Sequence, residues 1–421
     1  MSNCKFLLTF APMKRFGLYI IILYSVLLVA GCRDRLEYPV DLTPKPRAEA
    51  ERTVIIYMAA DNTLDNYPSA ARADTTEMVS SKDMIPENVN FIIFMDTRSG
   101  KPAIYELSAK NGMQLWKQYG EELCSTSADV MLQVLREIKT FFPARHYGIT
   151  FWSHATGWTP RHNVRRKTFG QDDYPGTSTS GETEMEIPVL RDVLAQLPKF
   201  DYIFFDACFM QCIEVAYELR EVTDYMIGSP AEIPGPGAPY YKIVEPLCQG
   251  DAMGIVRGYD SGYPSSIYTG VLLSCIDCSQ LEPLAEATGR FLTPIYMEHK
   301  EPPSLQGFLC YCDMAVNKFT YCFDMRTTMY RLLPPEDYAA WMELYNQAVP
   351  LYTLTPPHDG RIYPEWYANY CDYSVIVAPE CYGGVSMFVP MTRYDTDGYH
   401  WNEDFQKTAW YTAAGWAATG W

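Results

Sequence analysis

The sequence has 421 residues, of which 20% are charged and 48% are hydrophobic, so it is typical of a globular protein rather than a disordered one. Its net charge of −17 at pH 7 argues against a nucleic-acid partner, because an acidic surface repels phosphate groups. A mature chain of roughly 390 residues predicts one large domain with an extension, or two domains.

The N-terminus predicts export and a lipid anchor. Three basic residues precede an uncharged apolar run over 17–30, and small residues then lead to Cys32. This order is typical of a cleaved secretory signal over 1–31, and the run is too short and wrongly flanked for a durable membrane span. The ending is similar to a bacterial lipobox, which predicts a lipid on Cys32; loss of the three positive charges changes the net charge from −17 to −20. An uncleaved signal-anchor helix is the alternative interpretation.

Residues 32–51 are predicted to be a tether. They contain three prolines and many charges without apolar periodicity, which indicates an extended coil of about 20 residues. Together with the lipid, the tether would hold the folded part at the periplasmic or cell-surface face of a bacterial membrane.

The cysteines do not predict a metal site. Of the 13 cysteines, eleven remain after Cys4 and Cys32 are set aside. Export permits disulfides, and an odd number leaves room for one free thiol. The pair Cys275-x-x-Cys278 has no second CxxC pair to complete four ligands, so zinc is not expected.

Four apolar runs predict β-strands, at 53–58, 91–95, 147–152 and 201–205. Each run is continuous rather than alternating, as expected of strands that are covered on both faces. Apolar residues at helical spacing predict helices at 127–140, 187–197 and 210–222. Strands that alternate with helices favour a parallel α/β sheet with right-handed crossovers, in which the active site lies beyond the carboxyl ends of the strands.

After about residue 275 the pattern loosens. Further elements are expected as helices at 281–292 and 335–348 and as strands at 375–378 and 385–389. The tail from Tyr399 is rich in tryptophan and tyrosine. Scattered aromatic residues are most often core and rim packing, whereas an exposed platform of them would indicate a glycan-binding lipoprotein.

Two of the predicted strands end beside residues of the types that enzymes use for covalent catalysis. The strand at 147–152 leads to His154, and the strand at 201–205 leads to Cys208 in the stretch IFFDACFM. If consecutive strands are neighbours, both side chains emerge on one rim. There the imidazole would activate the thiol, and the positive end of a helix starting at Met210 would stabilise the thiolate. This arrangement predicts a Cys/His hydrolase; a structural histidine and an inert buried cysteine are the alternatives.

Several motifs resemble those of the clostripain family of cysteine peptidases. They are the opening strand VIIYMAADNTL, the histidine motif WSHATGW, the nucleophile motif FDACFM, and the segments EVAYELR, SPAEIPGPG and GVSMFVP. The similarity covers about residues 52–390 with the motifs in the expected order. It implies a caspase-like αβα sandwich with a mainly parallel central sheet, in which a C-terminal α/β part at 276–421 completes a catalytic core at 52–275. It also implies an endopeptidase that cleaves peptide or protein substrates after a basic residue.

Matched residue by residue, the resemblance implies that Cys208 is the nucleophile and that His154 transfers the proton. The backbone N–H groups of Cys208 and Ala155 would bind the oxyanion. The family usually has glycine where this chain has Ala155; alanine keeps the N–H but resists positive φ. If that conformation is required, the chain is instead a catalytically weak or inactive clostripain-like lipoprotein that binds peptides or proteins.

Two acids are candidates for substrate selection. Asp206 matches a family acid that helps to receive the basic substrate side chain, and Glu232 is a second candidate in the same wall. Carboxylates in a partly desolvated pocket pair well with Arg or Lys. A carboxylate bonded to backbone at a strand end is the alternative for Asp206, and an exposed loop acid is the alternative for Glu232. No cofactor is expected; some relatives use calcium, but no acidic loop is specific enough to assign its ligands.

A basic stretch between the two catalytic motifs is a candidate processing site. Arg166 and Lys167 follow the histidine strand in a loop-like segment, and the family is often matured by a cut in this region. We therefore predict self-cleavage near Arg166 or Lys167, which would free a blocked specificity pocket. A solvated basic loop on an acidic protein is the alternative.

Overall fold

The computed structural model describes residues 45–66, 68–158, 169–173, 184–263, 271–302, 308–311, 313–314, 319–320, 322–354, 361–362, 375–376, 382–396 and 400–421. The predicted signal peptide at 1–31, the lipidation site Cys32 and the processing candidates Arg166 and Lys167 lie outside the described residues. In the part of the chain that is described, none of the helices is long and apolar enough to cross a bilayer.

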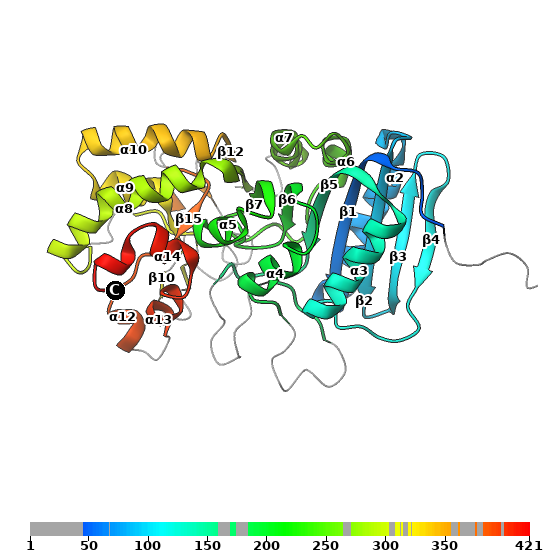
Figure 1. Ribbon diagram of the computed structural model, residues 1–421, viewed down its shortest axis with the longest axis horizontal. Helices are drawn as coiled ribbons and strands as arrows, with labels where there is room; N and C mark the ends of the chain where they lie inside the picture. Colours follow the sequence, from blue (N-terminus) through cyan, green and yellow to red (C-terminus); the bar gives the residue numbers. More distant parts are fainter. Residues whose placement is uncertain are drawn as a thin grey trace, which may run out of the picture. The chain divides into compact units, whose positions relative to one another are not determined.

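Nine of the described strands form one sheet in the order β12-β8-β7-β6-β5-β1-β2-β3-β4 (Figure 1). Its centre is parallel and contains β2 (Val89–Thr97), β1 (Ala50–Ala60), β5 (Ala144–Trp152), β6 (Phe200–Asp206) and β7 (Thr223–Gly228). Antiparallel strands flank it, namely β3 (Gly100–Ser108), β4 (Gly112–Gln118), β8 (Leu272–Asp277) and β12 (Leu351–Leu354). The predicted, mainly parallel α/β sheet is therefore confirmed, and β1 includes the last two residues of the predicted tether.

Helices cover both faces of this sheet. In β1, Ile55 and Tyr57 enter one hydrophobic core, whereas Val54 and Ile56 enter another. The first core contains residues of α3 (Ala128–Phe141), α4 (Ile187–Leu194) and α5 (Ile213–Leu219), and the second contains residues of α2 (Ala70–Ser80), α6 (Tyr240–Gln249) and α7 (Ala252–Gly262). Figure 1 shows α3 lying in front of β1 and β2. The strands are apolar at every position because alternate side chains are buried in different cores, which is the predicted αβα sandwich.

The described residues after β8 add mostly helical structure. The helices α8 (Leu281–Glu298) and α10 (Pro335–Ala348) agree with the predicted ones. The strand predicted at 385–389 is shorter, β15 (Ser386–Met387), and pairs with β11 (Phe323–Asp324). Of the strand predicted at 375–378, the described residues form β14 (Val375–Ile376), which pairs with β13 (Arg361–Ile362). The other elements are β9 (Asp313–Met314), β10 (Phe319–Thr320), α9 (Met325–Leu332), α12 (Arg393–Thr396), α13 (Trp401–Phe405), α14 (Ala409–Ala413) and the 3-10 turns η1 (Thr63–Asp65), η2 (Lys82–Met84), η3 (Cys278–Gln280) and η4 (Trp416–Ala418).

The described tryptophans of the C-terminal tail pack into the interior. Trp401, Trp410 and Trp416 are all buried. Trp410 packs edge-on against Tyr217 of α5, with ring centroids 5.6 Å apart. The described part of the tail therefore serves as core beside the helix that follows the nucleophile motif, and its tryptophans do not form a platform for glycans.

Candidate active site

The sheet brings the two candidate catalytic residues to one rim. Trp152 at the end of β5 pairs in register with Asp206 at the end of β6. His154 and Cys208 each follow two residues later, so they leave the sheet at matched positions on neighbouring parallel strands. Both side chains are half-buried. The structure therefore places them as the neighbour rule for consecutive strands predicts.

The histidine turn is held from two sides. Oγ1 of Thr63, in η1 after β1, lies 2.9 Å from Nε2 of His154, so this hydroxyl orients the imidazole ring. The main-chain oxygen of His154 accepts a hydrogen bond from the N–H of Gly170 at 2.9 Å. Sequence reasoning missed Thr63, although it lies in the motif VIIYMAADNTL, because its partner is 91 positions away.

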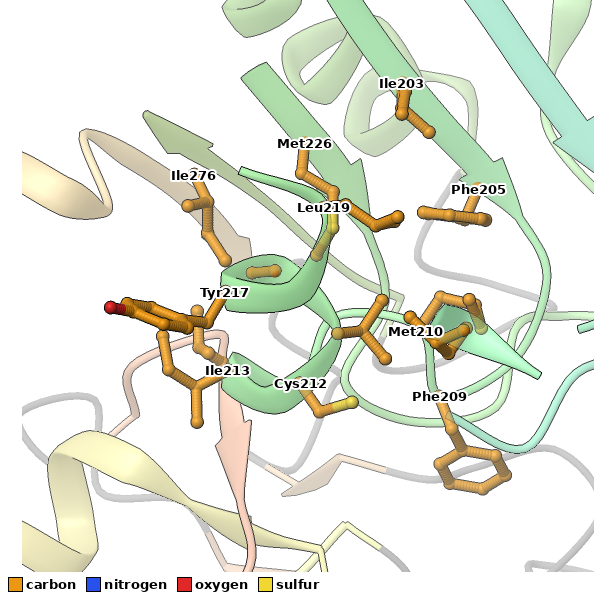
Figure 2. Packing of buried hydrophobic residues seen from close by; sticks show 14 of the residues in the cluster. Ile203, Phe205, Phe209, Met210, Cys212, Ile213, Tyr217, Leu219, Met226 and Ile276 are labelled. Carbon is orange, nitrogen blue, oxygen red and sulfur yellow. The ribbon is translucent and has the colours of Figure 1, made fainter. Parts of the chain in front are cut away.

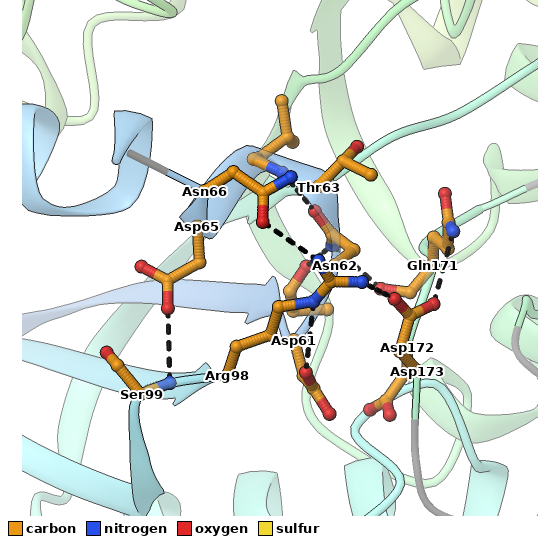
Figure 3. Close-up of polar contacts among 12 residues, drawn as sticks. Asp61, Asn62, Thr63, Asp65, Asn66, Arg98, Ser99, Gln171, Asp172 and Asp173 are labelled. Atoms are coloured by element: carbon orange, nitrogen blue, oxygen red, sulfur yellow. Dashed lines mark hydrogen bonds and ion pairs between the residues drawn. The ribbon is translucent and has the colours of Figure 1, made fainter. Parts of the chain in front are cut away.

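Residues 169–173, here termed the strap, lie against the ends of β1 and β5. Nδ2 of Asn62 donates to the carbonyl oxygen of Gln171 at 2.8 Å (Figure 3). It also donates to the carbonyl oxygen of Ala59 at 2.8 Å. Oγ of Ser153 donates to the Ala59 oxygen at 2.7 Å and accepts from the N–H of Gln171 at 3.1 Å. Asn62 and Ser153, which the sequence did not single out, therefore join the histidine turn, β1 and the strap through buried polar contacts.

The strap also brings acids to the ends of β1 and β2. Asp172 accepts hydrogen bonds from the N–H and the hydroxyl of Ser125. Arg98 forms ion pairs with Asp173 and Asp61 (Figure 3). Within the described residues, no group of three or more His, Cys, Asp or Glu side chains is placed to hold a metal ion, so calcium ligands stay unassigned.

The chain turns sharply after the nucleophile candidate. Phe209 has a φ of 61°, in the left-handed region. Its N–H donates to the carbonyl oxygen of Ala231 at 2.9 Å, and the N–H of Gln211 donates to that of Ser229 at 3.0 Å. The nucleophile motif is thus paired with the SPAEIPGPG segment rather than wound directly into a helix.

This pairing delays the next helix, which corrects one prediction. The helix α5 begins at Ile213 and not at Met210 (Figure 2). The predicted helix start at Met210 is therefore wrong, and the turn at Phe209 separates Cys208 from α5. Sγ of Cys208 instead accepts a hydrogen bond from the N–H of Ile233 at 3.5 Å.

The motifs EVAYELR and GVSMFVP meet behind the nucleophile turn. Oε1 of buried Glu214 accepts a hydrogen bond from the N–H of Phe388 at 2.7 Å, and burial raises the pKa of Glu214 to about 7. The N–H of Ser386 donates to the main-chain oxygen of Gln211 at 3.0 Å. The side-chain amide of Gln211 donates to the main-chain oxygen of Ser274 at 3.0 Å. These motif residues therefore support the turn from behind.

Ala155, the departure from the family pattern, has an ordinary backbone conformation. Among the described non-glycine residues, Phe209 and His400 have positive φ and Ala155 does not. The glycine that the turn requires is Gly157, with a φ of 73°, where an added Cβ would lie 2.9 Å from the Phe209 oxygen. Ala155 also pairs with Phe169 of the strap in an isolated antiparallel bridge. Its methyl group therefore causes no left-handed strain.

Of the two acids proposed for selectivity, Asp206 ends β6 two residues before Cys208, and Glu232 precedes the residue whose N–H contacts the thiol. Asp206 is 2% exposed, and its Oδ2 accepts hydrogen bonds from the N–H of Ala238 at 3.2 Å and the hydroxyl of Tyr240 at 3.0 Å. No described residue donates a hydrogen bond to its Oδ1. Burial raises the pKa of Asp206 to about 7. Glu232 is half-buried rather than an exposed loop acid, and it precedes Ile233 at the thiol.

The other described cysteines differ from Cys208. Eight of the cysteines lie among the described residues. Burial raises the pKa of Cys212, Cys275 and Cys278, which makes them poor nucleophiles. Cys124 and Cys310 are partly exposed like Cys208, so Cys208 is distinguished by its place on the rim with His154.

Comparison with known proteins identifies the family. The model of the clostripain family matches residues 56–419. The chain belongs to the clostripain family. Among curated protein sequences, none matches it.

Solved structures of clostripain-family proteins share its fold. A secreted C11 cysteine protease from Bacteroides thetaiotaomicron, in complex with an irreversible peptide inhibitor, is 30% identical and superposes with a TM-score of 0.72 over 88% of this chain and 100% of that one. An inactive zymogen of a C11 protease from Parabacteroides distasonis is 26% identical, with a TM-score of 0.72 over 87% and 99% of the two chains. The present clostripain-family protein is therefore a cysteine peptidase with the fold of secreted relatives, and its substrates are peptides.

Proposed function

We propose that this clostripain-family protein is an exported endopeptidase that cleaves after Arg or Lys, with Cys208 as nucleophile and His154 as its proton-transfer partner. The observation that carries the proposal is the matched exit of these two residues from neighbouring parallel strands β5 and β6. A half-buried thiol and imidazole on one rim of an α/β sheet suit nucleophilic catalysis.

The chemistry follows from the groups on this rim. His154 takes the thiol proton, and Sγ of Cys208 attacks the carbonyl carbon of the scissile bond. The N–H groups of Cys208 and Ala155 donate hydrogen bonds that stabilise the negative charge developing on the carbonyl oxygen. His154 then protonates the leaving amine as the carbon–nitrogen bond breaks, and water activated by the same imidazole hydrolyses the thioester.

The surroundings support these roles. The hydrogen bond from Ile233 N–H to Cys208 Sγ favours the thiolate over the thiol. The hydroxyl of Thr63 at Nε2 of His154 holds the ring in one orientation until a substrate enters. Neither feature requires a helix end at the nucleophile.

Asp206 and Glu232 support the proposed preference for a basic residue. Buried Asp206 has one carboxylate oxygen bonded within the pocket wall and a second to which no described residue donates. A buried carboxylate of this kind is stabilised by a guanidinium or ammonium group. Glu232, one residue before the amide that contacts Cys208, supplies a further negative charge.

The first experiment is hydrolysis of short fluorogenic peptides ending in Arg or Lys by the processed protein under reducing conditions. Cys208→Ala and His154→Ala should each lower kcat/KM by at least about 10³-fold. Peptides that end in neutral residues provide the specificity control. Absence of cleavage by the processed parent protein would refute the enzyme assignment.

We also propose maturation by a cut near Arg166 or Lys167. The strap lies just after these residues and is bonded to Asn62 and Ser153, so a cut before it would leave the histidine turn supported. The structural relative described as an inactive zymogen agrees with such a step. Sequencing the new N-terminus of active protein beside Cys208→Ala tests this; a cut that persists in the variant excludes self-cleavage.

Anchoring through a lipid on Cys32 completes the proposal, with the folded part on the periplasmic or cell-surface face of a bacterial membrane. It is supported by the sequence pattern at residues 17–32. Labelling with a radioactive fatty acid should mark the parent protein and not Cys32→Ser. Equal labelling of both proteins would exclude this anchor.

A further inference from the structure

A second buried acid lies behind Asp206. Asp74 of α2 is 1% exposed, and its Oδ2 accepts a hydrogen bond from Nε1 of Trp152 at 2.6 Å. Trp152 is in turn the register partner of Asp206 across β5 and β6. The indole therefore places Asp74 next to the acid that is proposed to select the substrate.

The last residue of the SPAEIPGPG segment and the residue after it lie against the two acids. The N–H of Ala238 donates to Oδ2 of Asp206 at 3.2 Å. The preceding Gly237 has a φ of 74°, and a Cβ there would lie only 2.7 Å from Oδ2 of Asp74. The hydroxyl of Tyr263 donates to the Gly237 oxygen and keeps the segment in place. The two acids thus lie against two adjacent residues, Gly237 and Ala238.

No basic side chain balances these acids in the part of the chain that the structure describes. The titratable groups around them are Glu77 on α2, Tyr240 on α6, Tyr259 on α7, Tyr263 just after α7, and the thiol of Cys208. No arginine or lysine among the described residues shifts the pKa of Asp74, Asp206 or Glu77. Two buried neighbouring carboxyl groups cannot both ionise readily unless a cation is supplied.

We propose that Asp74 is a positioning residue of the specificity pocket, which shares one proton with Asp206 while the pocket is empty and releases it when a cationic substrate side chain enters. The inference rests on the proposed preference for Arg or Lys. The substrate supplies the positive charge that the two carboxylates lack, and the proton passes to water. No bond of the substrate forms or breaks in this step.

The charge state of the pair agrees with this role. Burial, and then the charge of Asp206, raise the pKa of Asp74 to about 9, whereas burial raises the pKa of Asp206 to about 7. Between these values the empty pair holds one proton and one negative charge. The affinity for a cationic side chain should therefore increase as the pH rises from about 7 to about 9, while a neutral isostere should show no such increase.

The substitution Asp74→Asn distinguishes the effect of the negative charge at this position from the effect of its hydrogen bond to Trp152. Asparagine keeps an oxygen that can accept from Trp152 Nε1, but it cannot ionise. We compare kcat/KM from pH 6 to pH 9.5 on two peptides that differ only in a final arginine or its neutral isostere citrulline. At pH 9, Asp74→Asn should lower kcat/KM about tenfold or more on the arginyl peptide and leave kcat/KM on the citrullyl peptide unchanged. A loss of this size is expected when one charged partner is removed. The increase in kcat/KM on the arginyl peptide between pH 7 and pH 9 should also be smaller in the variant than in the parent protein.

Asp96→Asn is the matched control, because Asp96 is another buried acid, at the end of β2 and outside the pocket wall. It should leave the ratio of arginyl to citrullyl cleavage unchanged. The proposal is wrong if Asp74→Asn keeps the parent's ratio of arginyl to citrullyl cleavage and its pH profile. It is also wrong if kcat/KM falls equally for both peptides at every pH. If the parent protein cleaves neither arginyl nor lysyl peptides, the proposed function and this inference fall together.

Proton release gives a test that does not depend on folding of the Asp74 variant. Cys208→Ala protein is titrated calorimetrically at pH 8 with the arginyl peptide in two buffers of different ionisation enthalpy. Binding should release about one proton, and the citrullyl peptide should release none. Binding of the arginyl peptide without proton release would overturn the shared-proton pair while leaving the basic preference intact.

Discussion

At the scale of single residues, the candidate nucleophile depends on its neighbours in space. The left-handed turn at Phe209 carries the chain away from a helical path and directs it along the SPAEIPGPG segment. As a result, an amide from Ile233, and not a helix end, contacts Cys208 Sγ. Strain of this kind persists only where the surrounding contacts enforce it, and it is common at functional sites.

Thr63→Val tests whether the hydroxyl at Nε2 orients the imidazole. Valine keeps the shape and removes the hydrogen bond to His154, so kcat should fall by up to about tenfold with little change in KM. Steady-state kinetics on an arginyl peptide measure this. Thr76→Val is the matched control, because the Thr76 hydroxyl bonds only within its own exposed helix turn. Equal effects of both substitutions would show that Thr63 does not orient the ring.

Ala155→Gly tests the departure from the family pattern. Because Ala155 does not have positive φ, glycine relieves no strain there, and kcat/KM should stay within about twofold of the parent value. The added backbone freedom should lower the free energy of unfolding by about 0.5–1 kcal/mol. Kinetics and denaturant unfolding measure the two effects. A tenfold gain in kcat/KM would mean that alanine limits catalysis.

At the scale of elements, the strap is the connection that holds the histidine turn. It links β1, β5 and the turn at His154 through side chains of Asn62 and Ser153 that are almost fully buried. Buried polar contacts of this kind are costly to break on one side only, because the remaining partner loses its hydrogen bond without regaining water.

Asn62→Ala should therefore weaken both stability and catalysis. It leaves the Ala59 and Gln171 oxygens without this donor, which should cost on the order of 1–3 kcal/mol. We also expect lower kcat, measured on the processed protein. Asn90→Ala, at the start of β2, removes a hydrogen bond to Thr53 at the opposite end of the sheet and should leave kcat unchanged. A normal kcat in Asn62→Ala would show that the strap has no catalytic role.

At the scale of the whole molecule, the net charge of −17 coexists with several buried acids. Burial, and then the carboxyls of neighbouring acids, raise the pKa of Asp96 to about 9. An acid whose pKa is higher in the folded state than in the unfolded state binds more protons when folded. Stability should therefore fall as pH rises from about 4 toward about 9.

Asp96→Asn should reduce this pH dependence. For the one proton that Asp96 holds, the parent protein should lose about 1.4 kcal/mol per pH unit between its unfolded and folded pKa values. Denaturant unfolding at pH 5.5 and pH 8.5 should show that the free energy of unfolding falls less in the variant than in the parent protein as the pH rises. Asp83→Asn, an exposed acid in η2, should follow the parent. Parallel curves for the parent and Asp96→Asn would contradict the raised pKa.

Much of the sheet could be predicted because its centre is locally encoded. Runs such as 53–58 and 201–205 are apolar at every position, and this pattern already indicates strands with two covered faces. The hairpin β3–β4 was missed because β4 is largely solvent-accessible and lacks a continuous apolar run. The start of α5 was misplaced because residues 210–212 have helical spacing but bond to distant segments instead.

By itself, the sequence determined the α/β class, the family and the two catalytic candidates, because apolar runs and motif residues are properties of neighbouring positions. Only the tertiary structure decided that Thr63 faces His154, that Ile233 contacts Cys208 and that Asp74 lies behind Asp206. Each of these contacts joins residues far apart along the chain, and their geometry arises only when the strands align in register and the connecting segments close over the rim.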